Sequence, residues 1–233
     1  MLVFFKRKNN DKGSIGEKIV SKKLNKLNKK YYVINDLLIE TKNGTSQMDH
    51  VVISIYGIFV IETKNYSGTI YGNDINYNWQ QKIGTKYNKF RNPIKQNYSH
   101  IKAIQCIFPE LKERCFFSII VFNRGVSLKV NTEYDVIKVR KLKKTIKKHK
   151  DILLEVDEVK YLYETLLRAN IKSNRIKRKH IKNIEKSIKK TNKKIRKKRC
   201  PRCNGRLKKI KGVNGYFYGC KNYPKCRFTK EID

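Results

Sequence analysis

The strongest apolar signal along the chain is in residues 47–65, where two runs rich in β-branched side chains flank Tyr56-Gly57. This pattern predicts a β-hairpin with a tight turn at the glycine. Most positions in both runs are apolar, so we expect the hairpin to be central in a sheet covered on both faces. Asp49, Glu62 and Lys64 interrupt the apolar runs, and charges there are costly unless they are paired or hold a metal.

A two-residue loop at Tyr56-Gly57 places Val51 opposite Glu62 and Asp49 opposite Lys64. Since opposed residues share a face and side chains alternate along a strand, the three charged side chains are expected on one face. Asp49 and Glu62 would be diagonal neighbours, roughly 7–8 Å apart, and could share a hard divalent cation. Lys64 could orient a water or stabilise developing negative charge. The alternative is an ion pair between Lys64 and Asp49 on an exposed sheet edge.

The flanking pattern predicts a mixed α/β sheet with helices, because strand and helix signals alternate. A helix is expected from Ser14 to about Lys30, with Ser14 and Glu17 forming a capping box. The segment 72–90 is polar and expected to be rich in loops. Further strands are expected at 31–40, 67–71, 115–122 and 134–139, and further helices at 92–108 and 153–167.

Several side chains in this region admit two interpretations. Trp79 is expected to be a packing anchor, and a base-stacking platform is the alternative. His100 is expected to be a surface or satisfied histidine rather than a general base. Cys106 and Cys115 lie among apolar residues and are expected in the core.

The charge balance points to a polyanionic partner. In 233 residues, 56 Lys and Arg oppose 19 Asp and Glu, a formal net charge of +37. Nucleic acid is the first candidate and an anionic membrane surface the second. No run reaches the ~18 apolar residues that a membrane span needs. The apolar start is too short for a signal peptide, so we expect a cytoplasmic protein.

Residues 172–199 form a basic arm, with 15 Lys and Arg against Glu185 and with isoleucines at near-helical spacing. Repulsion should keep the arm loose when it is free. Phosphates would attract it and release counterions, so nucleic-acid contact is expected. A solvated linker and an anionic membrane surface are the alternatives. The candidate phosphate contacts are Lys189, Lys190, Lys193 and Lys194.

The last four cysteines have the spacing of a zinc ribbon, with two residues inside the first pair, sixteen between the pairs and five inside the second. Four thiolates around one zinc can fold a module that is too small for its own core. Two disulfides would need an oxidising compartment. The ligands would be Cys200, Cys203, Cys220 and Cys226. Candidate nucleic-acid contacts are Tyr216, Phe217, Tyr218 and Tyr223 for stacking and Arg202 and Arg206 for phosphates.

The order acid, hairpin and then Glu62-Thr63-Lys64 resembles the PD-(D/E)xK nuclease superfamily. The fuller run 47–50, 57–68 and Trp79 resembles one branch of it, the nuclease-related domain (NERD), over roughly residues 12–125. The resemblance implies a restriction-endonuclease-like mixed sheet flanked by helices. It also implies a nuclease dependent on Mg²⁺ or Mn²⁺, with Asp49 and Glu62 as metal ligands and Lys64 assisting.

The same resemblance implies two further catalytic residues. An acid on the first helix completes the metal site in such nucleases, and Glu17 matches it, although capping could also explain Glu17. Gln96 resembles the glutamine that several of them place beside the metal, and an exposed helix glutamine is the alternative.

Residues 200–228 resemble the C-terminal C4 zinc finger of type IA DNA topoisomerases, which implies single-stranded DNA binding. No topoisomerase catalytic domain accompanies it. The expected parts are a tail (1–11), a nuclease-like domain (12–125), its strand and helix extension (126–171), a basic helical linker (172–199) and the ribbon (200–233). We expect a DNA-binding, metal-dependent nuclease of DNA processing. A non-catalytic nucleic-acid-binding scaffold and an RNA-binding accessory protein are the alternatives.

Overall fold

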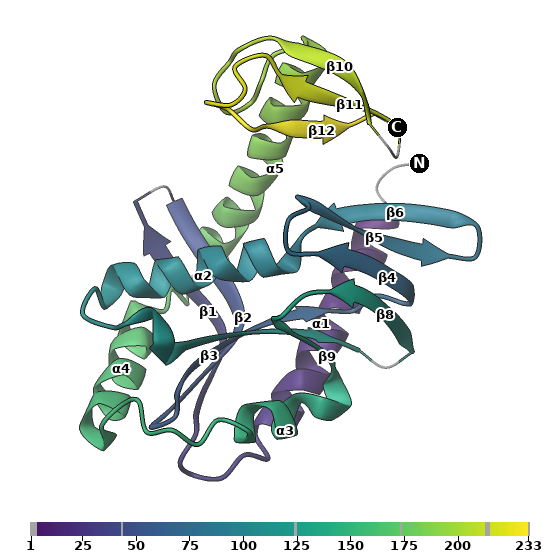
Figure 1. The fold of residues 1–233 in the computed structure, drawn as a ribbon. Helices are drawn as coiled ribbons and strands as arrows, with labels where there is room; N and C mark the ends of the chain where they lie inside the picture. The colour runs from purple at the N-terminus through teal and green to yellow at the C-terminus, as the bar shows by residue number, and fades with distance from the viewer. Residues whose placement is uncertain (1–3, 43, 124, 173, 213–214, 233) are drawn as a thin grey trace. The chain divides into compact units, whose positions relative to one another are not determined.

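The structure, a computed structural model, describes residues 4–42, 44–123, 125–172, 174–212 and 215–232. The described chain forms two compact units that divide after Lys172 (Figure 1). The first is a mixed α/β unit, and the second joins one long helix to a small three-stranded sheet.

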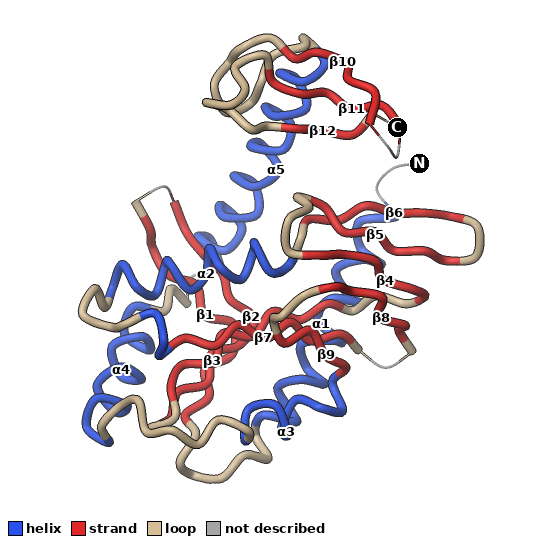
Figure 2. The backbone as a smooth tube through the Cα atoms, viewed as in Figure 1, coloured by secondary structure: helices blue, strands red, loops and turns tan. Residues whose placement is uncertain are grey.

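A five-stranded sheet is the centre of the first unit, with the strand order β1-β2-β3-β7-β9 (Figure 2). The first three strands pair antiparallel, whereas β3, β7 and β9 run parallel. The carboxyl ends of β3, β7 and β9 therefore lie side by side at the same end of the sheet. The bounds are β1 Tyr32–Thr41, β2 Gly44–Ser54, β3 Gly57–Lys64, β7 Phe116–Phe122 and β9 Asp135–Lys138.

Helices cover both faces of this sheet, as the apolar character of both faces of the hairpin predicts. Helices α2 (Pro93–Ile107) and α4 (Val156–Ala169) pack on the face that carries Val51 and Val60. Helix α1 (Phe4–Leu24) and the short α3 (Leu142–Lys147) pack on the other face, which carries Phe59. Two 3₁₀ turns, Glu113–Cys115 and Val139–Lys141, lead into β7 and α3.

A second sheet, with the order β6-β5-β4-β8, shares a core with the first. Trp79 and Ile70 pack with Phe122 of β7 and Ile94 of α2. Trp79 is fully buried, so its prediction as a packing anchor is confirmed. The bounds are β4 Gly68–Asn73, β5 Asn78–Ile83, β6 Lys86–Arg91 and β8 Val126–Asn131.

Strands β5 and β6 contradict the expectation that 72–90 is loop-rich. The segment does alternate, since Trp79 and Gln81 are buried while their neighbours on β5 are not. The signal is hidden in the sequence because one inward position is a glutamine. Burial is tolerated there because Gln81 Nε2 donates a hydrogen bond of 2.8 Å to the carbonyl oxygen of Ser67.

Two further details differ from expectation. Helix α1 begins at Phe4 and ends at Leu24, so Ser14 lies inside it and the predicted capping box is wrong. Its buried face is Gly16, Val20 and Leu24 at helical spacing. Cys106 is exposed on α2, whereas Cys115 is buried as expected.

The second unit contains α5 (Asn174–Arg196) and the antiparallel sheet β10-β11-β12. The arm that was expected to be loose is helical over this range; residue 173 and several side chains of residues 174–184 lie outside the described part. Ile195 of α5 packs with Tyr218 and Phe228 around the cysteines. The bounds of the strands are β10 Leu207–Gly212, β11 Gly215–Cys220 and β12 Thr229–Glu231. None of the described helices has the length and apolar character needed to span a membrane.

Candidate functional site

The hairpin of β2 and β3 has a different register from the predicted one. Ser54 pairs with Gly57 and His50 with Ile61, so the turn is Ile55-Tyr56 and the prediction is wrong by two residues. Gly57 is needed as the first residue of β3. Its φ is +122°, and a Cβ there would lie 2.7 Å from the carbonyl oxygen of Cys115. A shift of two residues preserves the alternation of side chains between the two faces. Extending the β2–β3 ladder by one pair beyond His50 and Ile61 places Asp49 opposite Glu62.

Glu62, Lys64 and Gln96 form a connected group at the carboxyl end of β3. Lys64 Nζ donates to Glu62 Oε1 at 2.6 Å and to Gln96 Oε1 at 3.1 Å. Burial alone raises the pKa of Glu62, but Lys64 and then His100 outweigh it and lower the pKa to about 2. Burial alone lowers the pKa of Lys64, and Glu62 reverses this effect, so the net shift is upward. The pair is therefore a carboxylate and an ammonium at neutral pH.

The second oxygen of Glu62 faces His100 on α2. Glu62 Oε2 lies 3.3 Å from His100 Nε2, and neither atom has a hydrogen-bond partner within the described ranges. His100 Nδ1 shares a hydrogen bond of 2.9 Å with Ser46 Oγ. His100 is buried, so it is not a surface histidine, and its contacts with Ser46 and Glu62 agree with the expectation of a satisfied one.

Asp49 lies beside this group and closes the end of the β2–β3 ladder. The backbone N–H of Thr63 donates to Asp49 Oδ2 at 2.7 Å. Burial and then the charge of Glu62 raise the pKa of Asp49 well above its usual range, although the bond from Thr63 opposes this shift. Glu17 raises it further and Lys64 lowers it. The charges of Asp49, Glu62, Lys64 and Glu17 thus act on one another at this edge of the sheet.

Gly16 explains how Glu17 reaches the site from α1. A Cβ at Gly16 would lie 2.8 Å from Asn123 Nδ2 and 2.9 Å from Asn65 Cβ, so only a glycine permits this approach. Asn123 Nδ2 donates to Asn65 Oδ1 at 2.6 Å, which ties the ends of β7 and β3 together. The helix can therefore approach the residues that immediately follow Lys64.

Glu17 and one further acid enlarge the carboxylate cluster. Partial burial, then Asp36 and then Glu62 raise the pKa of Glu17. Asp36 has a φ of +56°, unusual for a non-glycine residue, and its Oδ1 accepts a 2.7 Å hydrogen bond from Gln47 Nε2. Sequence reasoning missed Asp36, since nothing in the strand pattern marks a left-handed residue. Strained backbone is common at functional sites.

Four cysteines form the second candidate site. Cys200 Sγ lies 3.7 Å from Cys226 Sγ, and Cys203 Sγ lies 3.3 Å from Cys220 Sγ. All four sulfur atoms lie within 4.8 Å of one another, the one such group of three or more metal-ligating side chains within the described residues. Zinc–sulfur bonds of ~2.3 Å in a tetrahedron require sulfur separations of about 3.8 Å. The cluster fits a structural zinc, and a backbone hydrogen bond from Gly205 lowers the pKa of Cys203 to about 6.

The predicted nucleic-acid contacts of the second unit differ in exposure. Tyr216 and Tyr223 are 50% and 70% exposed, whereas Phe217 and Tyr218 are half-buried. Lys209 Nζ lies 4.3 Å from the centroid of the Tyr216 ring. The basic candidates Arg202, Arg206, Lys189, Lys190 and Lys193 are exposed, and Lys194 is half-buried.

Two protein families match separate parts of this chain. Residues 12–123 match the nuclease-related domain family, and residues 197–233 match the topoisomerase DNA-binding C4 zinc finger. An uncharacterized protein of Bacillus anthracis is 44% identical over 177 residues, 73% of this chain and 82% of that protein. No solved structure matches the chain.

The zinc-ribbon relatives are much longer proteins. DNA topoisomerase 1 of Methanocaldococcus jannaschii is 56% identical over 34 residues, 15% of this chain and 4% of the enzyme. DNA topoisomerase 1 of Methanothermobacter thermautotrophicus is 51% identical over 35 residues, 15% of this chain and 5% of the enzyme. The likeness is confined to the ribbon. The chain belongs to the nuclease-related domain family and carries a C-terminal zinc ribbon of the topoisomerase type.

Proposed function

We propose that this protein is a divalent-metal-dependent nuclease that acts on DNA in DNA processing. The observation that carries the proposal is the hydrogen-bonded chain from partly exposed Gln96 and Lys64 to buried Glu62, with Asp49 held beside it at the carboxyl end of β3. The zinc ribbon and the basic helix α5 would hold the DNA through stacking and phosphate contacts. Single-stranded or branched DNA is the expected substrate.

Asp49 and Glu62, with Glu17, would hold Mg²⁺ or Mn²⁺. Carboxylate oxygens are the ligands that these cations prefer. Glu62 Oε2 is buried, faces His100 Nε2 at 3.3 Å and makes no hydrogen bond among the described residues, and burial and then neighbouring carboxylates raise the pKa values of Asp49 and Glu17. Both features fit a site completed by a cation. When bound, the metal supplies an acidified water and stabilises charge on the phosphate.

Lys64 would act as a cation rather than as a base. Its raised pKa keeps the ammonium protonated at neutral pH, so it cannot accept a proton from water there. A fixed ammonium can instead donate to a phosphate oxygen as negative charge develops. Gln96 accepts from the same Nζ and fixes its direction.

The test is cleavage of labelled single-stranded and duplex DNA with added Mg²⁺ or Mn²⁺. Wild type is expected to cleave, and Glu62→Ala and Glu62→Gln are expected to lose cleavage. Glu164→Gln is the matched control, because Glu164 is an acid in an exposed pair with Arg168 on α4. Equal cleavage by wild type and both Glu62 variants would overturn the catalytic assignment.

A non-catalytic, nucleic-acid-binding scaffold is the second candidate, and one observation favours it. Within the described residues, no three acidic side chains bring ligand atoms within 4.8 Å of one another, and Lys64 already occupies Glu62 Oε1. Thermal unfolding with and without Mn²⁺ separates the candidates. A metal site predicts a rise in the unfolding temperature that Glu62→Gln abolishes, whereas no rise favours the scaffold.

A further inference from the structure

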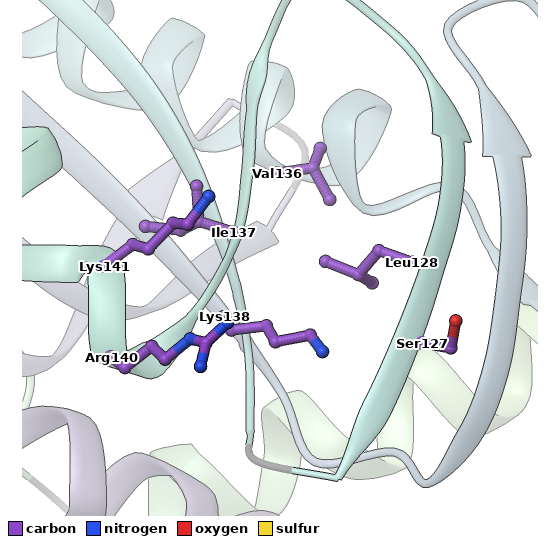
Figure 3. Close-up of a pocket in the computed structure, with 7 residues that line it drawn as sticks. All are labelled: Ser127, Leu128, Val136, Ile137, Lys138, Arg140 and Lys141. Carbon is purple, nitrogen blue, oxygen red and sulfur yellow. The ribbon is translucent and has the colours of Figure 1, made fainter.

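A pocket of about 360 Å³ lies in the first unit between β8 and β9. Strand β9 is the last strand of the five-stranded sheet, and β8 is the last strand of the four-stranded sheet. Figure 3 shows Leu128 and Val136 pointing into the gap between the two strands, and the Lys138 side chain reaching across towards β8. The pocket is lined by Ser127, Leu128, Val136, Ile137, Lys138, Arg140 and Lys141.

Three of the lining residues are cationic. None of the ion pairs among the described residues includes Lys138, Arg140 or Lys141. Asp135 of β9 cannot neutralise them fully, because it is held by Lys148 at 2.8 Å. Cations around a partly apolar hollow suit a ligand with an anionic group and an apolar body. A nucleotide unit of a DNA strand has this chemistry.

The pocket lies at the same end of the strands as Glu62 and Lys64. Lys64 pairs with Phe122, and Phe122 pairs with Lys138, so the two lysines are two strands apart. Strands are spaced ~4.8 Å apart, which separates the two backbones by about 10 Å. Ligands of parallel sheets bind outside the carboxyl ends of the strands, and Lys64 and Lys138 are the last residues of β3 and β9.

We propose that this pocket binds a phosphodiester of the DNA strand a few nucleotides away from the phosphate held at Lys64. The proposal rests on the proposed function, since it takes Lys64 as the place where DNA reacts. In duplex DNA each strand rises ~3.4 Å per nucleotide along the helix axis, so a separation of about 10 Å corresponds to at most about three nucleotides. Lys138, Arg140 and Lys141 meet the phosphate oxygens, the hydroxyl of Ser127 donates to one of them, and Leu128 and Val136 contact the sugar.

The experiment uses the full-length protein without added Mg²⁺ or Mn²⁺, so that binding is measured without cleavage. Affinity for a fluorescent 20-nucleotide strand is measured at several salt concentrations. The pocket variant is Lys138→Gln, Arg140→Gln and Lys141→Gln together. The control variant removes equal charge from exposed residues after α1, as Lys26→Gln, Lys29→Gln and Lys30→Gln. Loss of three phosphate contacts should lower the slope of log K against log salt by about 2 in magnitude.

Contact between the DNA and the pocket itself is tested by replacing Ser127 with the photoreactive residue benzoylphenylalanine. We expect it to cross-link the DNA strand, and we expect the pocket variant, but not the control, to lose the cross-link. Inorganic phosphate and a mononucleotide, at matched ionic strength, test a free anion as the occupant. Absence of the cross-link, equal losses in both variants, or full competition by phosphate alone would overturn the proposal.

The outcomes separate this proposal from the catalytic one. Wild type that cleaves no DNA, while the pocket variant still loses affinity and cross-linking, would refute the nuclease and support the pocket. Wild type that cleaves DNA, with affinity and cross-linking unchanged in the pocket variant, would refute the pocket alone. Matching unfolding temperatures of the variants would show that each retains its fold.

Discussion

Lys64 Nζ lies 2.6 Å from Glu62 Oε1, and the two residues are neighbours on the same face of β3. The same ammonium donates to Gln96 Oε1, so one cation joins the central strand to α2. Only 3% of the Glu62 side chain is exposed, and a buried carboxylate of this kind depends on its cationic partner. Loss of Lys64 would therefore leave a buried carboxylate without its cation.

Replacing Lys64 by methionine should disable the site. Lys64→Met removes the charge that lowers the pKa of Glu62, while the burial that raises it remains. We expect the cleavage rate to fall by about 10²–10³-fold, the usual effect of losing one donor to a developing charge. Lys102→Met is the control, because Lys102 forms an exposed pair with Glu113 and should leave the rate within about twofold.

Replacing Asp49 by asparagine should stabilise the metal-free protein and abolish cleavage. Burial and the charge of Glu62 oppose ionisation of Asp49, and an amide removes that cost while its oxygen can still accept from Thr63 N–H. We expect the free energy of unfolding to rise by about 1 kcal/mol, a common exchange of activity for stability. Urea unfolding without added metal measures this free energy. A decrease in stability would contradict the argument that burial and Glu62 oppose ionisation of Asp49.

Two glycines of α1 should respond to alanine in opposite directions. Gly16→Ala places a Cβ against Asn65 and Asn123, so α1 must move away and carry Glu17 with it. We expect lower stability and at least about tenfold slower cleavage, because small displacements of a catalytic group are costly.

Gly13→Ala is the matched control in the same helix. A Cβ at Gly13 has nothing within 4 Å, so the substitution should only favour the helix, by about 0.5–1 kcal/mol. Equal effects of the two substitutions would show that the approach of α1 at Gly16 is unimportant.

His149 should make stability depend on pH. The centroid of its ring lies 3.9 Å from the centroid of the Phe117 ring. Burial and then the charge of Lys148 lower the pKa of His149 below the ordinary value of 6.5. Below pH 6.5 the unfolded state binds the proton more readily, so this contribution is present above that pH and lost as pH falls towards the folded pKa. His149→Phe keeps an aromatic ring, and the drop in unfolding temperature from pH 7.5 to 5.5 should be smaller by about 1–2 °C. An unchanged drop would contradict the assignment.

The central hairpin could be predicted because its apolar density leaves few alternatives. Its register was wrong, yet the placement of Glu62 and Lys64 on one face holds, because an error of two residues preserves a period of two. Strands β5 and β6 could not be predicted, because hydrogen bonds such as that of Gln81 replace apolar burial there.

The remaining parts of the site depend on contacts between distant segments. Ser46 meets His100 only because α2 packs over β2, and the pocket forms only where the edges of two sheets approach each other. The left-handed backbone of Asp36 likewise has no local signal in the sequence. Local patterns therefore predicted the catalytic candidates on β3, and the tertiary fold added the residues around them.

Removing zinc should unfold the ribbon and leave the first unit intact. Trp79 is the one tryptophan of the chain and is fully buried in the first unit, so its fluorescence reports that unit alone. We expect one zinc per chain, and we expect Cys203→Ser or a chelator to release it, since such small modules depend on their metal. Trp79 emission should stay unchanged while affinity for single-stranded DNA falls by about tenfold or more, as the stacking side chains lose their support.

Thiol titration of the zinc-free chain tests the alternative of two disulfides, because cysteines paired as disulfides would not react. A ribbon that keeps its structure and its DNA affinity without zinc would contradict the assignment of Cys200, Cys203, Cys220 and Cys226 as one structural metal site.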